Sequence, residues 1–430
     1  MAHLNIFLSY AARVKHINIR HRRPIHPTVL SLLQYSAANH GSYLLPNLTT
    51  ARVTVPAWDP FTCLMGLSPN LQQLNLDLGF NKIRTDSNGW SNDAIAAEYL
   101  AKVARITSLQ HLELRGLALK SEGINLALIS MKSIRTLNLA TGNSLSARTL
   151  ATIATFPHLT QLEVQAGHID VDELVDLQSA NSTPLFPTLL HLRIRAHASL
   201  VEFLLQSMPA NCLESLILEA ERSTQPPSSW TTAFELIALK GAYSLREFTM
   251  EHHIDIDDSN PQHNAIKSRF TLATLSPLAK LPHLTRFVLD STPLPDLCDA
   301  DVGEFVKWWP NIKHLDLGGL IAPADCMKPC WKPRMTLGCL EIFARHCQHL
   351  ETVVVNIDLD STATDIKIPH PVQYALRSLT LGSTLPPDPV SLSNRLQNLF
   401  PSLREADGVA SHEEEWTAIY SILNGIVLES

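Results

Sequence analysis

One hydrophobic pattern recurs along the whole chain, Φ-x-x-Φ-x-Φ, in which Φ is an apolar residue and usually leucine. A clear copy is Leu109-Gln-His-Leu112-Glu-Leu114. The last two Φ positions are two residues apart, which is the period of a β-strand with one buried face. A strand of three or four residues cannot bury its apolar face alone. The pattern therefore predicts that the copies stack side by side as a parallel sheet with a shared apolar interior.

The pattern begins fourteen times, at uneven intervals. The predicted repeats start at Val14, Leu48, Leu71, Leu109, Ile134, Leu159, Leu189, Leu213, Leu245, Leu284, Ile312, Leu350, Leu376 and Leu403. Between the copies, apolar residues return with a helical period, as they do from Ile95 to Val103. Residues 412–425 contain Glu413-Glu-Glu, which suits the first turn of a helix, and they predict a C-terminal capping helix.

On these repeats the chain resembles the leucine-rich-repeat proteins. The resemblance implies an α/β solenoid with a curved parallel sheet on the concave side and helices and irregular loops on the convex side. We expect residues 1–430 to form a single irregular solenoid of this kind. The chain departs from the family three residues past the last Φ, where a buried asparagine or cysteine is usual. That position is occupied in four early copies by Gly79, Leu117, Gly142 and Gly167, which predicts irregular turns.

The first repeats also carry a narrower resemblance. The stretches Phe7–Ile19, Leu45-Pro-Asn-Leu48 and Leu67-Ser-Pro-Asn-Leu71 resemble the repeat region of fungal F-box leucine-rich-repeat proteins. In that family an N-terminal F-box docks the chain onto a ubiquitin-ligase scaffold, and the repeats hold the substrate. No F-box is recognisable before the first repeat, so a scaffold contact is expected only if an F-box lies outside these residues. The resemblance implies substrate recognition in ubiquitin-dependent turnover. The alternative is a scaffold or inhibitor that works without a ligase.

Composition and charge narrow the function classes. The chain has 430 residues, 45% of them hydrophobic, which excludes a wholly disordered protein. The formal net charge of −7 argues against nucleic acid as the partner, because a polyanion-binding protein needs a basic surface. No run of apolar residues has the length of a membrane helix, so we expect no membrane partner. The seven cysteines are odd in number and unevenly spaced, which favours a reduced, cytoplasmic or nuclear protein.

The sequence contains few candidates for catalytic or metal-binding residues. The usual nucleophile, phosphate-binding and metalloprotease motifs are absent from the sequence, and we expect no enzymatic activity and no cofactor. Cys326 and Cys330 have the spacing of zinc ligands, but Cys339 and Cys347 do not form a second tight pair, so no metal site is expected. A hydrolase or transferase within the irregular loops is a further alternative. Trp308-Trp309 is compatible with an exposed aromatic anchor or with packing at a helix end.

The outward side chains of the predicted strands are more informative about function than these motifs. By strand alternation, the residues between and beside the last two Φ positions project away from the core, toward the concave face. Repeat proteins use such extended faces to bind other macromolecules. On this face charges of one sign cluster in some repeats, with Arg193 and Arg195 in one and Glu219, Glu247 and Glu251 in the next ones. The predicted protein-binding residues of the concave face are His111, Glu113, Arg115, Gln161, Glu163, His191, Arg193, Arg195, Glu219, Glu247 and Glu251.

Overall fold

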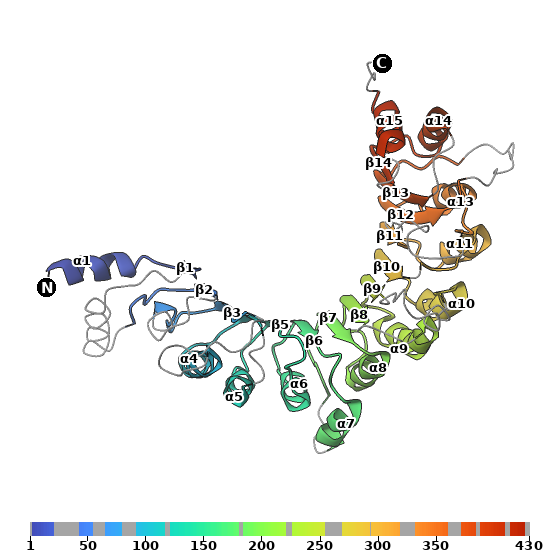
Figure 1. Ribbon diagram of the computed structural model, residues 1–430. Helices are drawn as coiled ribbons and strands as arrows, with labels where there is room; N and C mark the ends of the chain where they lie inside the picture. The colour runs from blue at the N-terminus through green and yellow to red at the C-terminus, as the bar shows by residue number, and fades with distance from the viewer. Residues whose placement is uncertain are drawn as a thin grey trace, which may run out of the picture. The chain divides into compact units, whose positions relative to one another are not determined.

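The structure is a computed structural model that describes residues 2–20, 43–54, 65–79, 92–116, 121–179, 184–220, 226–253, 269–292, 294–318, 332–359, 371–383, 388–408 and 413–425. Residue contacts divide the chain into two compact units. The N-terminal unit is Met1–Ala196 with Ser207–Pro209, and the C-terminal unit is His197–Gln206 with Ala210–Ser430. Within the described residues each unit contains seven strands, with helices between them (Figure 1).

The strands of the N-terminal unit each begin two residues after a predicted repeat start. They are β1 (His16–Ile19), β2 (Thr50–Thr54), β3 (Gln73–Asp77), β4 (His111–Arg115), β5 (Thr136–Ala140), β6 (Gln161–Gln165) and β7 (His191–Ala196). Neighbours pair in parallel and in chain order, with the first strand residue of one repeat opposite the first of the next.

The strands of the C-terminal unit follow the same rule. They are β8 (Ser215–Ala220), β9 (Glu247–His253), β10 (Arg286–Thr292), β11 (His314–Asp316), β12 (Thr352–Ile357), β13 (Ser378–Ser383) and β14 (Glu405–Gly408). They also pair in parallel and in chain order. The predicted α/β fold of stacked leucine repeats is therefore confirmed.

The repeat leucines form the apolar interior. Leu112, Leu137 and Leu162 are directly paired across β4, β5 and β6, and each is at most 2% exposed. Leu114 and Leu139 form a second buried row two residues further along the strands. Each repeat thus completes the core of its neighbour, as expected for units that cannot bury their apolar face alone.

The helices that connect successive strands lie on one side of the strands in each unit and leave the opposite sheet face open (Figure 1). In the N-terminal unit, α1 precedes the first strand and the other helices connect successive strands. These helices are α1 (Ala2–Ala11), α4 (Asn92–Ile106), α5 (Glu122–Ser130), α6 (Ala147–Ile153) and α7 (Val171–Ser179). Local chemistry sets their starts: the Ser146 hydroxyl accepts a 3.2 Å hydrogen bond from the Thr149 backbone N–H and so caps α6.

In the C-terminal unit one helix precedes the first strand, one follows the last strand, and the other described helices connect successive strands. The helices of this unit are α8 (Ala198–Ser207), η2 (Pro227–Trp230), α9 (Thr231–Gly241), α10 (Leu272–Leu275), η4 (Ser276–Lys280), α11 (Asp299–Phe305), α13 (Gly338–His346), α14 (Pro389–Leu399) and α15 (Glu413–Leu423). The last of these, α15, packs against β14 and α14 and buries Trp416 and Ile419.

Aromatic side chains fill the C-terminal core where the repeat leucine is replaced. Phe248 and Phe287 occupy the central Φ position of β9 and β10, with ring centroids 5.9 Å apart. Trp309 lies 4.6 Å from Phe287, is 1% exposed, and donates its indole N–H to the Leu278 carbonyl at 3.1 Å. Trp309 is therefore a packing residue at a helix end, while the neighbouring Trp308 is half-buried.

Glycines shape the turns where the family's asparagine is missing. Gly79 has a positive φ of 71°, and its backbone N–H donates a 3.0 Å hydrogen bond to the Asp77 carboxylate. Gly116 has a φ of 103°, and a Cβ there would overlap the carbonyl oxygen of Gly79 in the preceding repeat. Successive turns thus approach more closely than a side chain allows.

Candidate protein-binding surface

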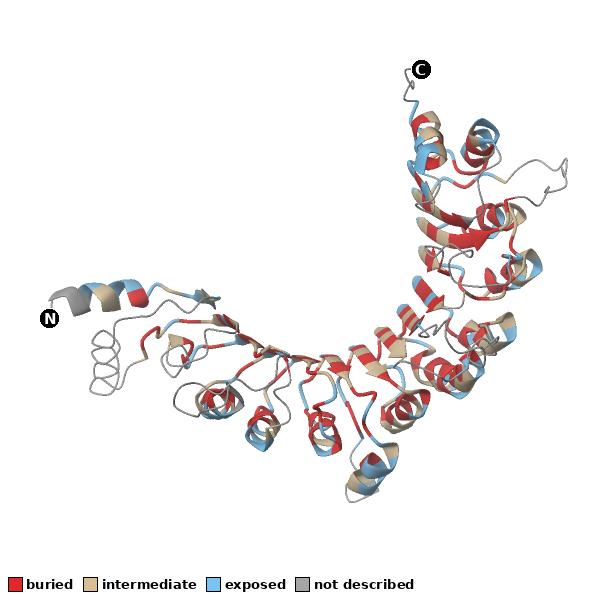
Figure 2. Ribbon diagram, viewed as in Figure 1, coloured by how far each residue is buried: buried red, intermediate tan, exposed pale blue. Residues whose placement is uncertain are grey.

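Strand alternation creates the candidate surface. Figure 2 shows buried and less buried residues alternating along the strands. Because side chains alternate between the two faces of a strand, the less buried ones project from the open face. The parallel register then aligns the outward side chains of neighbouring strands in rows. In the N-terminal unit the middle row of this open face is Asn18, Arg52, Asn75, Glu113, Asn138, Glu163 and Arg193.

Amides and carboxylates alternate along this middle row. Asn75 donates its side-chain amide to Glu113, and Asn138 donates its own to Glu163 at 2.8 Å. On the other side of Glu163, the Nε atom of Arg193 lies 3.9 Å from Oε1 of that carboxylate. The side-chain oxygens of Asn75 and Asn138 are buried and accept no hydrogen bond from the described residues. Three of the predicted residues, Glu113, Glu163 and Arg193, therefore lie in one row, in which Glu163 contacts Asn138 and Arg193 while Glu113 contacts Asn75.

The other predicted residues of the N-terminal unit flank this row. His111, Gln161 and His191 are exposed, stand at the first position of their strands, and form a row of their own. Arg115 is exposed and Arg195 is half-buried, both at the C-terminal part of their strands. All eight predicted residues of this unit thus lie on its open face.

A small hollow lies on this face over β5. Its volume is about 180 Å³, and it is lined by Gln73, Leu74, His111, Leu112, Glu113, Thr136, Leu137, Asn138, Gln161 and Glu163. Its shape follows from side-chain length, because β5 contributes the short Thr136 and Asn138 between the longer side chains of β4 and β6. The hollow is smaller than the roughly 300 Å³ or more of a typical small-molecule pocket, and it suits a single side chain.

The predicted acidic residues of the C-terminal unit also lie on its open face. Glu219 and Glu251 are directly paired on β8 and β9, and Asp290 of β10 is next in the same row. Glu247 is exposed and accepts a 3.2 Å hydrogen bond from the Ser215 hydroxyl. The ring Nε2 of His253 lies 3.4 Å from the carboxylate of Asp290.

The middle row of the C-terminal open face contains several apolar side chains, although the row beside it is acidic. Val288 and Val354 stand on either side of Asp316, and Ile217 occupies the same strand position in β8. Burial raises the pKa of Asp316, and its carboxylate accepts a 2.8 Å hydrogen bond from the Gly318 N–H. Val288, Val354 and Ile217 were not among the predicted residues of this face, although their place between the last two Φ positions identifies them in the sequence.

Several other side chains with potential chemistry are buried in the core. His252 follows Phe248 and Met250 at two-residue spacing on β9, is fully buried, and its ring lies edge-on to Phe270 at 5.4 Å. Cys339 and Cys347 are buried, and burial raises the pKa of the Cys347 thiol to about 12. The potential ligands Cys326 and Cys330 lie outside the described residues. Within the part of the chain that the structure describes, no three potential metal ligands come together.

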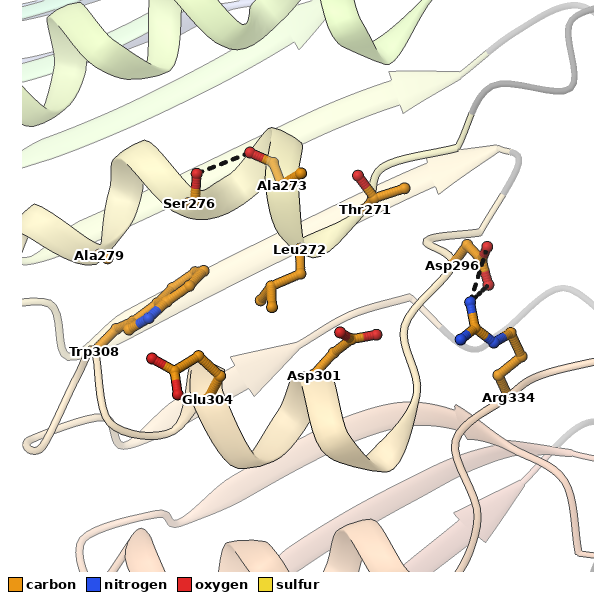
Figure 3. A pocket seen from close by; sticks show the side chains of 10 residues that line it. All are labelled: Thr271, Leu272, Ala273, Ser276, Ala279, Asp296, Asp301, Glu304, Trp308 and Arg334. Carbon is orange, nitrogen blue, oxygen red and sulfur yellow. Dashed lines mark hydrogen bonds and ion pairs between the residues drawn. The ribbon is translucent and has the colours of Figure 1, made fainter.

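A larger groove of about 620 Å³ lies among the helices of the C-terminal unit, between the α10–η4 segment and α11 (Figure 3). Its three acidic side chains have partners. Asp296 pairs with Arg334 at 3.3 Å, Asp301 accepts the Cys298 backbone N–H at 2.9 Å, and Glu304 pairs with Lys307 at 2.8 Å. Their contacts are those of helix capping and surface ion pairing.

Comparison with known proteins finds similarity to solved structures and none to a known sequence family. No protein-family model and no curated protein sequence matches the chain. The crystal structure of the Rad7 and Elc1 complex in yeast is similar, with a TM-score of 0.39 and 12% identity, over 72% of this chain and 87% of that chain. The leucine-rich repeat-containing protein LegL7 from Legionella pneumophila is similar with a TM-score of 0.40 and 14% identity, over 70% and 89%. These similarities concern the fold alone.

The chain has the fold of an α/β leucine-rich-repeat solenoid. In its described residues, no helix combines the length and the apolar character needed to cross a bilayer.

Proposed function

We propose that this chain is a protein-interaction module that acts by binding and without catalysis, through the open sheet faces of its two units. The observation that carries this proposal is the in-register row of charged and amide side chains on the N-terminal open face. Eight outward residues on β4, β6 and β7 align there with no described helix above them (Figure 1). Complementary charge on a partner would fix its register along such a row.

Within this class, the proposed role is substrate recognition of the F-box leucine-rich-repeat type. It rests on the resemblance of the first repeats, from Phe7 to Leu71, to the repeat region of that family. In this role the N-terminal open face would hold the substrate. The alternative within the same class is a scaffold or inhibitor that uses the same face without a ligase. Co-purification separates the two, since ligase-scaffold subunits accompany the chain only in the first.

Quantitative affinity purification tests the proposed binding function. The tagged full chain is compared with Arg193→Glu/Arg195→Glu, which reverses two charges of the N-terminal open face. The matched control is Lys132→Glu/Arg148→Glu, which reverses two exposed charges outside the sheet. We expect a set of proteins that the parent and the control recover equally and the open-face variant loses. Equal recovery of every protein by all three would contradict the proposal.

A further inference from the structure

We infer that the hollow over β5 receives one basic side chain, arginine or lysine, of an extended segment of the protein partner. This inference rests on the proposed function and specifies the partner's chemistry at the same face. The hollow has a defined place: Thr136 and Asn138 form its floor, Glu113 of β4 and Glu163 of β6 stand on either side, and His111 and Gln161 complete the walls.

The charge of the lining points to a cation. Two carboxylates, those of Glu113 and Glu163, border the hollow, and its lining contains no lysine or arginine among the described residues. The two glutamates are separated by one strand, so their Cα atoms are about 10 Å apart. A guanidinium or ammonium group placed over Asn138 would lie between both carboxylates. Hydrogen bonds from such a cation to a carboxylate are among the stronger ones in proteins.

The hydrogen-bond donors and acceptors of the middle row also favour a basic side chain. The amide N–H groups of Asn75 and Asn138 are already used on Glu113 and Glu163. The side-chain oxygens of the same two asparagines accept nothing from the residues that the structure describes. Those two oxygens are buried, so a partner cannot reach them. Each carboxylate keeps acceptor positions beyond the one that its asparagine amide occupies, so the row between β3 and β6 has a surplus of acceptors and of negative potential. Arginine, with five N–H donors and no acceptor, is the side chain that complements such a surplus most fully, and lysine offers three donors.

Arg193 limits where the cation can bind. Its Nε is 3.9 Å from Oε1 of Glu163 and approaches from the β7 side. The carboxylate of Glu163 is therefore shared between Arg193 and the hollow, whereas Glu113 receives an amide and no cation among its hydrogen-bond and ion-pair contacts with described residues. We place the partner's basic group on the Glu113 side of Asn138, where like-charge repulsion from Arg193 is weaker.

A peptide selection tests the inference with defined probes. A random twelve-residue phage-displayed library is selected on the full chain, and enriched peptides are synthesised for binding measurements. The test variant is Glu113→Gln/Glu163→Gln, in which each glutamine can still accept its asparagine amide. The matched control is Glu122→Gln/Glu173→Gln, which removes two exposed carboxylates from helices of the same unit.

The expected result is enrichment of arginine or lysine at one aligned peptide position. The Kd should weaken at least tenfold on the Glu113→Gln/Glu163→Gln chain and stay within twofold on the control. Replacing that peptide arginine with citrulline, or that lysine with acetyl-lysine, should cause a similar loss. Thr136→Phe, which fills the hollow and keeps both carboxylates, should also abolish binding and serves if the glutamine variant does not fold.

Two other outcomes separate the inference from the proposed function. Peptides that lose binding on Arg193→Glu/Arg195→Glu but bind Glu113→Gln/Glu163→Gln as tightly as the parent would overturn the basic-side-chain inference and leave the binding face intact. Peptides whose binding no open-face variant changes, or a selection that enriches none, would overturn both.

Discussion

The side-chain amide of Asn138 donates a 2.8 Å hydrogen bond to the carboxylate of Glu163, its direct neighbour across β5 and β6. The same donor and acceptor types meet between Asn75 and Glu113, two strands earlier. Neighbouring repeats therefore support each other's polar side chains as well as each other's leucines. A partner meets glutamates that are already oriented, which lowers the entropy cost of binding.

Charge reversal on this face should affect binding far more than stability. Arg193→Glu/Arg195→Glu removes the contact with Glu163 and places a like charge beside it. Because the side chains of Arg193 and Glu163 are 42% and 41% exposed, we expect the free energy of unfolding to fall by no more than about 1 kcal/mol. Urea unfolding measures this change. A loss of several kcal/mol would show that the pair is a structural element of the sheet.

The positions of the strands were predictable because the repeat specifies them locally. Each Φ-x-x-Φ-x-Φ copy, such as Leu109 to Leu114, identifies which residues face inward and which outward. The outward placement of Glu113 and Arg193 follows directly from this alternation. The contacts between repeats do not follow, because they depend on side chains separated by a whole repeat: nothing local to Asn138 indicates that it pairs with Glu163.

The ends of some strands were also beyond the repeat pattern. The predicted motif ends at Met250 in β9, yet the strand continues to His253, since Glu251, His252 and His253 pair with Asp290, Ser291 and Thr292 of β10. The continuation turns His252 into the core at the same two-residue period. His252 is therefore buried, in a part of β9 that pairs with an equally long neighbouring strand.

The aligned interior leucines should dominate stability. Leu137 is 1% exposed and lies between Leu112 and Leu162, so Leu137→Ala removes contacts to both neighbouring repeats. We expect a loss of about 2–5 kcal/mol in the free energy of unfolding. Leu126→Ala, at a side chain that is 56% exposed on α5, should change it by less than about 0.5 kcal/mol. Equal effects in chemical denaturation would mean that Leu137 is not a core residue.

Two glycine-to-alanine variants should have opposite signs. Gly116 has a φ of 103° and no room for a Cβ beside the Gly79 carbonyl, so Gly116→Ala should destabilise the chain by more than about 1 kcal/mol. Gly303 lies within α11, and no described atom is within 4 Å of the position that an added Cβ would take. Gly303→Ala should stabilise the chain by about 0.5–1 kcal/mol. Thermal unfolding distinguishes the two variants. If both variants were destabilised, the close approach of the turns would not be the reason for the loss in Gly116→Ala.

His314 should make stability depend on pH. Burial, and then the positive charge of Arg286, lower the pKa of this imidazole below its ordinary 6.5. Near pH 6.5 the imidazole binds a proton in the unfolded chain, whereas in the folded chain it stays neutral to a lower pH. The free energy of unfolding therefore falls as the pH drops below about 6.5. His314→Gln should make the urea midpoint less sensitive to pH between about 5 and 7. The control is His191→Gln, which removes an exposed imidazole from β7. An unchanged slope would contradict the burial argument.

Site-specific photo-crosslinking tests the binding face most directly. A photoreactive amino acid is placed at Gln161, which is exposed on β6 and borders the hollow, or at Leu126 on the helical side of the same unit. After irradiation of cells that carry each variant, crosslinked proteins are identified by mass spectrometry. We predict a discrete protein adduct at position 161 that Arg193→Glu/Arg195→Glu removes, and no such adduct at position 126. An adduct at position 126 alone, or one at 161 unaffected by the charge reversal, would contradict the account.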